Sequence, residues 1–186
     1  VNVDTGARRQ VTGKDAVQPS VSPDGRWVAY WRNVGGQRDI MLVAAQGGEP
    51  VMLTNDPPLD YNPRWAADGQ SIFFVSDRGG ERNLWRLGVD VEAPGPDGSP
   101  VLVAGGPSRL GSFSVSRNGR VVVSVTAGVT RAVRVPLDAA GAPRGPAEDA
   151  FASARRWIIT DANAATQTLA VFVTEPTDDV QLSSWD

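Results

Sequence analysis

The chain has 186 residues, of which 41% are hydrophobic, enough for one buried core but not for a second domain. Its 18 basic and 21 acidic residues give a formal net charge of −3 and form no basic stripe, so we expect no nucleic-acid partner. It contains neither cysteine nor histidine, which excludes disulfides, Ser-His-Asp triads and most zinc sites, and no apolar run approaches a membrane span, so we expect neither a cofactor nor membrane insertion.

The first twelve residues predict the end of a unit that precedes the repeats. Residues 5–12 combine a Thr-Gly turn with a Val-Thr ending, much as residues 46–54 combine a glycine pair with a Leu-Thr ending. We therefore expect a strand at residues 8–12 that corresponds to the fourth strand of an earlier unit.

An internal repeat follows. Residues 18–30 align without a gap with residues 62–74, and the offset between Asp24 and Asp68 is 68 − 24 = 44 residues. In the first copy, Ser-Pro-Asp-Gly at 22–25 predicts a chain reversal, because proline presets φ, aspartate bonds nearby amides and glycine accepts a positive φ. Short runs of Val, Ile, Trp, Tyr and Phe around these turns predict antiparallel strands.

Two further copies are less regular. The third, at residues 113–123, places Asn118 where the aspartates stand, 118 − 68 = 50 residues after the second copy. The larger offset is explained by a proline- and glycine-rich insertion at residues 93–100, which we expect to form a loop. The fourth copy keeps apolar runs at residues 155–159 and 168–173 but lacks the Asp-Gly turn.

Four short strands in each repeat of this length predict the blades of a β-propeller. We therefore expect one all-β domain over residues 1–186, with four blades of four antiparallel strands each and no substantial helix. The approximate blades are residues 13–54, 55–104, 105–149 and 150–186, and residues 1–12 end a preceding blade.

The sequence resembles a known family. The turn at 22–25, the run Phe-Phe-Val-Ser-Asp-Arg-Gly-Gly at 73–80 and the Leu-Thr pair at 53–54 are similar to the TolB-like, WD-type β-propeller repeat. Proteins with this repeat include periplasmic adaptors of the Tol-Pal envelope system, sensor regions of bacterial kinases and regulators, and gating propellers of prolyl oligopeptidases. The resemblance implies a bacterial protein in the periplasm or another extracytoplasmic compartment.

Propeller geometry indicates where binding is expected. The loops before the first strands and the hairpins between second and third strands lie at one mouth of the central channel. We expect a protein partner there, because these loops mix arginine with tyrosine and tryptophan, which concentrate binding energy at interfaces. The candidate rim residues are Lys14, Asp15, Trp31, Arg32, Asp60, Tyr61, Arg78 and Arg131. An alternative for Asp77 and Arg78 is that they tie one blade to the next.

Other patterns are better explained by structure than by chemistry. The carboxylate pairs that could act as acid and base lie in predicted loops, where solvated acidic residues usually occur: Asp178-Asp179, Asp56 with Asp60, and Glu148-Asp149. The tryptophans at strand positions predict core between blades: Trp27, Trp65, Trp85 and Trp157.

Three classes of function follow. The leading hypothesis is a non-catalytic scaffold for protein-protein interaction. One alternative is a substrate-gating accessory propeller of a prolyl-oligopeptidase-type hydrolase, whose Gly-x-Ser-x-Gly segment this chain lacks. The other is a ligand- or metal-sensing propeller of a bacterial kinase or regulator, in which carboxylates would surround a hard cation. The full-length gene tests the first alternative, and calorimetry with calcium tests the second.

The chain is predicted to be an arc of a larger propeller of about six to eight blades. Residues 1–4 resemble the tail of a third strand, an element that residues 180–185 already supply to the last blade. The two ends therefore overlap instead of interlocking. An incomplete ring exposes strand edges and apolar blade faces, so we expect self-association.

Overall fold

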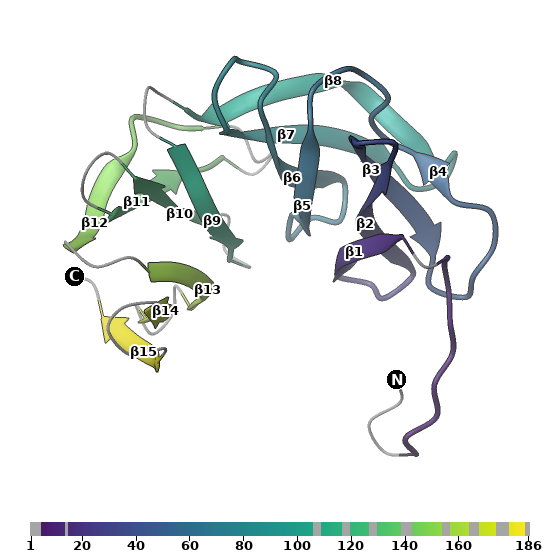
Figure 1. The fold of residues 1–186 in the computed structure, drawn as a ribbon, viewed down its shortest axis with the longest axis horizontal. Coiled ribbons are helices and arrows are strands. Elements are labelled where there is room, and N and C mark those ends of the chain that lie inside the picture. Colours follow the sequence, from purple (N-terminus) through teal and green to yellow (C-terminus); the bar gives the residue numbers. More distant parts are fainter. Residues whose placement is uncertain are drawn as a thin grey trace.

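Four antiparallel sheets stand side by side along an open arc, with the first and fourth sheets at its two ends (Figure 1). The described residues contain no helix, and so none that could cross a membrane. The all-β prediction is confirmed. The computed structural model describes residues 5–13, 15–105, 109–116, 120–126, 130–138, 143–153, 157–163, 168–173 and 179–184.

Each sheet is a meander in which strands that follow one another in the chain are hydrogen-bonded neighbours. The first contains β1 (Ala16–Val21), β2 (Trp27–Val34), β3 (Gln37–Ala44) and β4 (Val51–Met52). The second contains β5 (Asp60–Trp65), β6 (Ser71–Ser76), β7 (Asn83–Asp90) and β8 (Gly95–Ala104). The third contains β9 (Arg109–Val115), β10 (Arg120–Thr126), β11 (Thr130–Pro136) and β12 (Glu148–Ser153). The described part of the fourth contains β13 (Trp157–Asn163), β14 (Thr168–Val173) and β15 (Asp179–Ser184).

The sheets correspond to the predicted blades only in part. Three sheets have the four strands that were predicted, whereas the described residues of the last sheet form three. Four blades of four strands are therefore not confirmed, and the sheets do not close into a ring (Figure 1). The division of the chain near residues 54, 104 and 149, and the number of blades in the whole propeller, stay predictions.

Turn chemistry explains where the innermost strands end. Asp24 accepts hydrogen bonds through Oδ1 from the Ser22 hydroxyl at 2.6 Å and from the Arg26 backbone amide at 3.0 Å. The Ser22 hydroxyl, together with Arg26, holds the pKa of the Asp24 carboxyl well below its usual range. In the second sheet, Asp68 accepts from the backbone amide of Gln70 at 2.8 Å. The glycine after each aspartate has a positive φ, so both chain reversals form as the repeat predicts.

Apolar side chains fill the spaces between neighbouring sheets. The cluster between the first and second sheets contains Ala29, Ile40, Leu42, Leu53, Trp65, Ile72, Phe74, Leu87 and Val89. The cluster between the second and third contains Ala66, Phe73, Val75, Leu84, Val103, Leu110, Phe113, Val121, Val123 and Val135. Because alternate residues of β6 enter opposite clusters, both faces of this strand are buried.

The tryptophans behave largely as predicted. Trp65 is buried in the cluster between the first two sheets, and Trp27 and Trp85 pack against that cluster. The side chain of Trp157 lies outside the described residues.

The strand predicted at residues 8–12 is not formed. The guanidinium of Arg9 donates to the backbone oxygens of Ala45 and Gln46, and Thr12 donates from Oγ1 to the Tyr30 hydroxyl at 3.0 Å. Side chains therefore hold this segment against the first sheet, and its backbone has no partner strand. The assignment of residues 1–12 to a preceding blade stays a prediction.

The insertion at residues 93–100 is not a loop, contrary to expectation. Most of it belongs to β8, which pairs with a lengthened β7 through Gly88 with Asp97, Val89 with Pro96, and Asp90 with Gly95. Proline and glycine led to the loop prediction, but β8 is the outermost strand of its sheet, where a missing backbone N–H costs no ladder bond. The insertion therefore lengthens a hairpin at the outer edge (Figure 1).

Candidate binding mouth of the channel

Strand register places the predicted rim at one end of the sheets. Ala16 pairs with Arg32 in the first sheet, and Asp60 pairs with Ser76 in the second. The entry of each innermost strand therefore lies beside the hairpin between the second and third strands. Gln37 Nε2 in the first hairpin donates to two backbone oxygens of the loop that leads into β5, at 2.7 and 2.9 Å. This contact joins the same end of the two sheets.

For four of the predicted rim residues the described part of the structure shows no contact that bears on binding: Lys14, Asp15, Arg32 and Arg131. Asp15 is exposed and Arg32 is half-buried at this end of the first sheet. Arg131 pairs with Val125 at the corresponding hairpin of the third sheet, but its side chain is not described. Lys14 lies outside the described residues.

Arg78 and Asp60 form a buried ion pair. Nη2 of Arg78 lies 2.7 Å from Oδ2 of Asp60, and the two side chains are 11% and 0% exposed. Nη1 of Arg78 lies 3.1 Å from Oδ2 of Asp56, in the loop that arrives from the first sheet. The guanidinium carbon also lies 5.3 Å from the Phe74 ring centroid and 5.6 Å from that of Trp85. This geometry supports the alternative in which Arg78 ties one blade to the next.

Asp60 and Asp77 bond groups within the protein. Burial raises the pKa of Asp60, and the Ser76 hydroxyl and the Arg78 guanidinium oppose that rise. Asp77 accepts through Oδ1 from the backbone amide of Leu59 at 2.8 Å. Within the described ranges, no group of three or more acidic side chains could hold a metal ion.

Trp31 and Tyr61, both predicted rim residues, lie with two arginines that were not predicted. The guanidinium of Arg38 lies 5.1 Å from the Trp31 ring centroid and 5.8 Å from that of Tyr61. The guanidinium of Arg82 lies 5.7 Å from the Tyr61 ring centroid. We call Trp31, Arg38, Tyr61 and Arg82 the aromatic-arginine cluster. Its members come from the first and second sheets and remain partly exposed.

The repeat itself contains a signal for the missed arginines. Arg38 and Arg82 are separated by 82 − 38 = 44 residues, the same offset that relates the two Asp-Gly turns. Arg38 is the second residue of β3, and Arg82 directly precedes β7, so each lies at the start of a third strand. Extending the alignment beyond the second strands would therefore have placed both at the same position of successive blades.

Bulges in the innermost strands shape this mouth. Gln18 and Asn62 occupy equivalent repeat positions, and both have left-handed backbone conformations, with φ of 50° and 56°. The pairing of β1 and of β5 shifts register around these residues. At the first bulge, Oε1 of Gln18 accepts a 2.7 Å hydrogen bond from the Trp31 indole. The Gln18 side chain thus holds one aromatic ring of the cluster. Left-handed backbone conformations of residues other than glycine are typical of functional positions.

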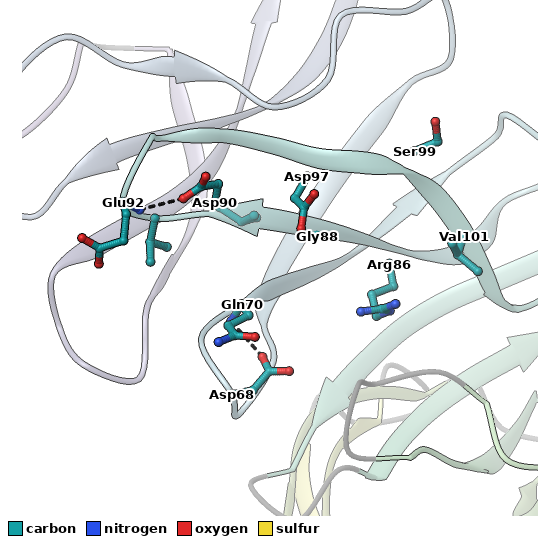
Figure 2. A pocket seen from close by; sticks show the side chains of 11 residues that line it. Asp68, Gln70, Arg86, Gly88, Asp90, Glu92, Asp97, Ser99 and Val101 are labelled. Atoms are coloured by element: carbon teal, nitrogen blue, oxygen red, sulfur yellow. Dashed lines mark hydrogen bonds between the residues drawn. The ribbon is translucent and has the colours of Figure 1, made fainter.

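A separate acidic hollow lies on the outer part of the second sheet (Figure 2). It has a volume of about 560 Å³ and is bounded by the β7–β8 hairpin and the turn at Asp68. Asp90 accepts from the backbone amides of Ala93 and Glu92, both at 2.9 Å, and these bonds lower its pKa. Asp68 and Asp90 serve their own turns, and no group of three or more acidic side chains among the described residues of the hollow could hold a metal ion.

Radially arranged antiparallel meanders whose innermost strands contact one another, with apolar clusters between sheets, define a β-propeller. The chain belongs to the family of the TolB β-propeller domain, whose model, PD40, matches residues 1–136. The predicted TolB-like resemblance is confirmed at the level of the family.

Curated relatives match shorter segments. The Tol-Pal system protein TolB of Wolinella succinogenes is 33% identical over 91 residues, which cover 48% of this chain and 22% of that protein. The protein of the same name from Bordetella pertussis is 38% identical over 52 residues, or 27% of this chain and 12% of that protein. The chain thus matches less than a quarter of the length of these relatives.

Solved structures share the fold. The chain superposes on TolB from Acinetobacter baumannii with a TM-score of 0.68 and 17% identity, over 96% of this chain and 48% of that one. It superposes on a puromycin-hydrolysing peptidase from Mycobacterium tuberculosis with a TM-score of 0.69 and 17% identity, over 97% of this chain and 29% of that one. At these identities the comparison establishes the propeller fold alone.

Proposed function

We propose that this propeller is a non-catalytic module that binds a protein partner at the mouth carrying the aromatic-arginine cluster. The observation that carries the proposal is the placement of Arg38 and Arg82 over partly exposed aromatic rings. Neither guanidinium forms an ion pair with a described residue. Arginine, tyrosine and tryptophan are the residue types that most often dominate interface energies.

The relatives suggest the class of partner. Because the curated relatives are named Tol-Pal system proteins, we propose that the partner is a component of a Tol-Pal-type envelope system. The same relationship supports the expected periplasmic or other extracytoplasmic location.

The lack of the usual catalytic side chains in this sequence supports a non-catalytic role. The sequence has no histidine or cysteine, and the Asp60 carboxyl at the mouth is buried in an ion pair. The accessory role beside a hydrolase and the sensor role stay alternatives, and a Gly-x-Ser-x-Gly segment in the parent gene would favour the hydrolase alternative.

The binding proposal is tested with a double variant. Arg38→Gln with Arg82→Gln should weaken binding to the Tol-Pal partner by about tenfold or more, because two cations are lost from the cluster. Isothermal titration calorimetry with the Tol-Pal proteins of the source bacterium measures the affinity.

The matched control is Arg120→Gln with Arg144→Gln, which removes the same charge from two exposed positions outside the mouth. Equal affinity for both double variants, or no binding of any Tol-Pal protein by the unmodified chain, would contradict the proposal.

A further inference from the structure

A groove crosses the ends of the innermost strands β1, β5 and β9 that lie away from the aromatic-arginine cluster. Its volume is about 630 Å³, within the usual range for small-ligand sites. Ser20 comes from the first sheet, Arg64 and Trp65 from the second, and Ser114 from the third. The groove is therefore built by three successive blades.

Arg64 is the only charged side chain among the described residues that line this groove. It is half-buried, and its guanidinium forms no ion pair or hydrogen bond with any described residue. Arg78 at the other end of the same sheet, by contrast, is neutralised by two aspartates. A guanidinium held between blades without a counter-ion attracts an anionic group.

The arginine at position 64 differs from the residues at the equivalent positions of the neighbouring repeats. Positions 20, 64 and 114 are equivalent in the three aligned copies, with offsets of 44 and 50 residues. Serine stands at the first and third positions, and arginine stands between them. Ser20 Oγ accepts from the Trp65 backbone amide at 3.3 Å, so its own hydroxyl hydrogen remains to be donated elsewhere. A cation is thus flanked by small hydroxyl side chains on both neighbouring strands.

We propose that this groove binds a ligand through a carboxylate group, with Arg64 as the recognising cation. One guanidinium matches the planar, singly charged carboxylate, whereas a polyphosphate requires several cations or a nest of backbone amides. The wall also includes the apolar side chains of Val21, Pro23 and Val115, which suits a ligand with a short apolar body. The carboxylate belongs either to a free organic acid or to the C-terminus of a peptide.

Two-dimensional NMR of the unmodified chain tests the site, with the Trp65 indole as reporter. This indole donates from Nε1 to the backbone oxygen of Ser20 at 3.2 Å, beside the groove. The probes are 3-phenylpropionate and its uncharged amide. The acid should shift the indole signal saturably, and the amide should not. Equal shifts from acid and amide, or no saturable shift with any carboxylate probe, would overturn the proposal.

Substitution of the cation provides the second measurement. Arg64→Gln should lower the affinity for 3-phenylpropionate by about tenfold or more, the loss expected when a charge-assisted hydrogen bond is removed. Arg82→Gln, which removes an exposed positive charge at the opposite mouth, should leave it unchanged. Equal affinities of Arg64→Gln and the unmodified chain would also refute the site.

A third comparison distinguishes the two sources of the carboxylate. A Gly-Phe dipeptide with a free C-terminus is titrated beside the same dipeptide with an amidated C-terminus and beside 3-phenylpropionate. Tighter binding of the free dipeptide assigns the site to peptide C-termini, and tighter or equal binding of 3-phenylpropionate assigns it to a free organic acid. If only the amidated dipeptide binds, the carboxylate proposal is wrong.

Discussion

The side chain of Arg78 holds together groups from two sheets, so its removal should leave a buried charge without compensation. In Arg78→Met the Asp60 carboxyl, which is fully buried, loses its nearest cation. We expect the free energy of unfolding to fall by about 3 kcal/mol at neutral pH, as is usual when one partner of a buried ion pair is removed. Thermal or urea unfolding measures this loss.

The pH dependence of this variant follows from the direction of the Asp60 shift. Burial raises the folded-state pKa of Asp60 above its unfolded value, so protonation favours the folded state. The stability that protonated Asp60 contributes is present at low pH and is lost as the pH rises through its folded-state pKa. Loss of the Arg78 cation raises that pKa further. The deficit of Arg78→Met should therefore be largest at neutral pH and should shrink on acidification.

The double variant Asp60→Asn with Arg78→Met is the control for this mechanism. It removes the uncompensated charge, and we expect it to unfold at a higher temperature than Arg78→Met at neutral pH. A deficit of Arg78→Met that is constant with pH, with no recovery in the double variant, would show that the ion pair is not the cause.

For individual residues, the sequence predicts which end of a sheet a side chain lies at better than it predicts whether the side chain is exposed. Trp31 was expected at the mouth from its place near a hairpin and Tyr61 from its place at a blade entry, and both lie at this end of the sheets. Asp60 was expected at the same mouth as a blade entry and Arg78 as a hairpin residue, but their side chains form a buried ion pair. Their exposure depends on this pairing of a strand entry with a hairpin 18 residues further along the chain, which no local pattern encodes.

Among the strands, the long hairpin of β7 and β8 depends on one glycine. A Cβ at Gly88 would lie 2.5 Å from the backbone oxygen of Asp97, so Gly88→Ala must push the two strands apart. We expect a loss of about 1–3 kcal/mol in the free energy of unfolding, the usual cost of overpacking. Urea denaturation followed by tryptophan fluorescence measures it.

Gly95→Ala, in the same hairpin, is the matched control. The nearest atom to its added Cβ is the Ala93 oxygen at 3.7 Å, an ordinary contact. Its stability should therefore stay close to that of the unmodified chain. If the two variants lose equal stability, the close approach of Gly88 to Asp97 is not what limits substitution.

An element is predictable from the sequence when the residues that stabilise it lie close together in the chain. The Asp-Gly turns were predicted correctly, because Asp24 and Asp68 bond amides within two residues of themselves. The strand at residues 8–12 was predicted wrongly, because strand formation requires a partner and Arg9 is held through its side chain instead. The insertion at 93–100 was misassigned because the restriction on proline disappears at a sheet edge.

For the molecule as a whole, the open arc predicts association between copies. The sheets do not close, and Val101 and Leu102 on the edge strand β8 are 48% and 47% exposed. Unpaired edges and apolar surface favour contact with another chain. Size-exclusion chromatography with light scattering should give a mass above the 19.7 kDa of one chain, rising with protein concentration. A single species at the mass of one chain over the whole concentration range would contradict this prediction.

The outward extension of β7 and β8 also defines a position where the length of the chain is free to vary. The insertion that creates it leaves the inner strand of its sheet with the same bulge as the preceding sheet, since Gln18 and Asn62 share one backbone conformation. Its tip, at residues 92–94, is exposed. A fluorescent reporter, an affinity tag or a folded domain can therefore be inserted there without covering either mouth of the channel.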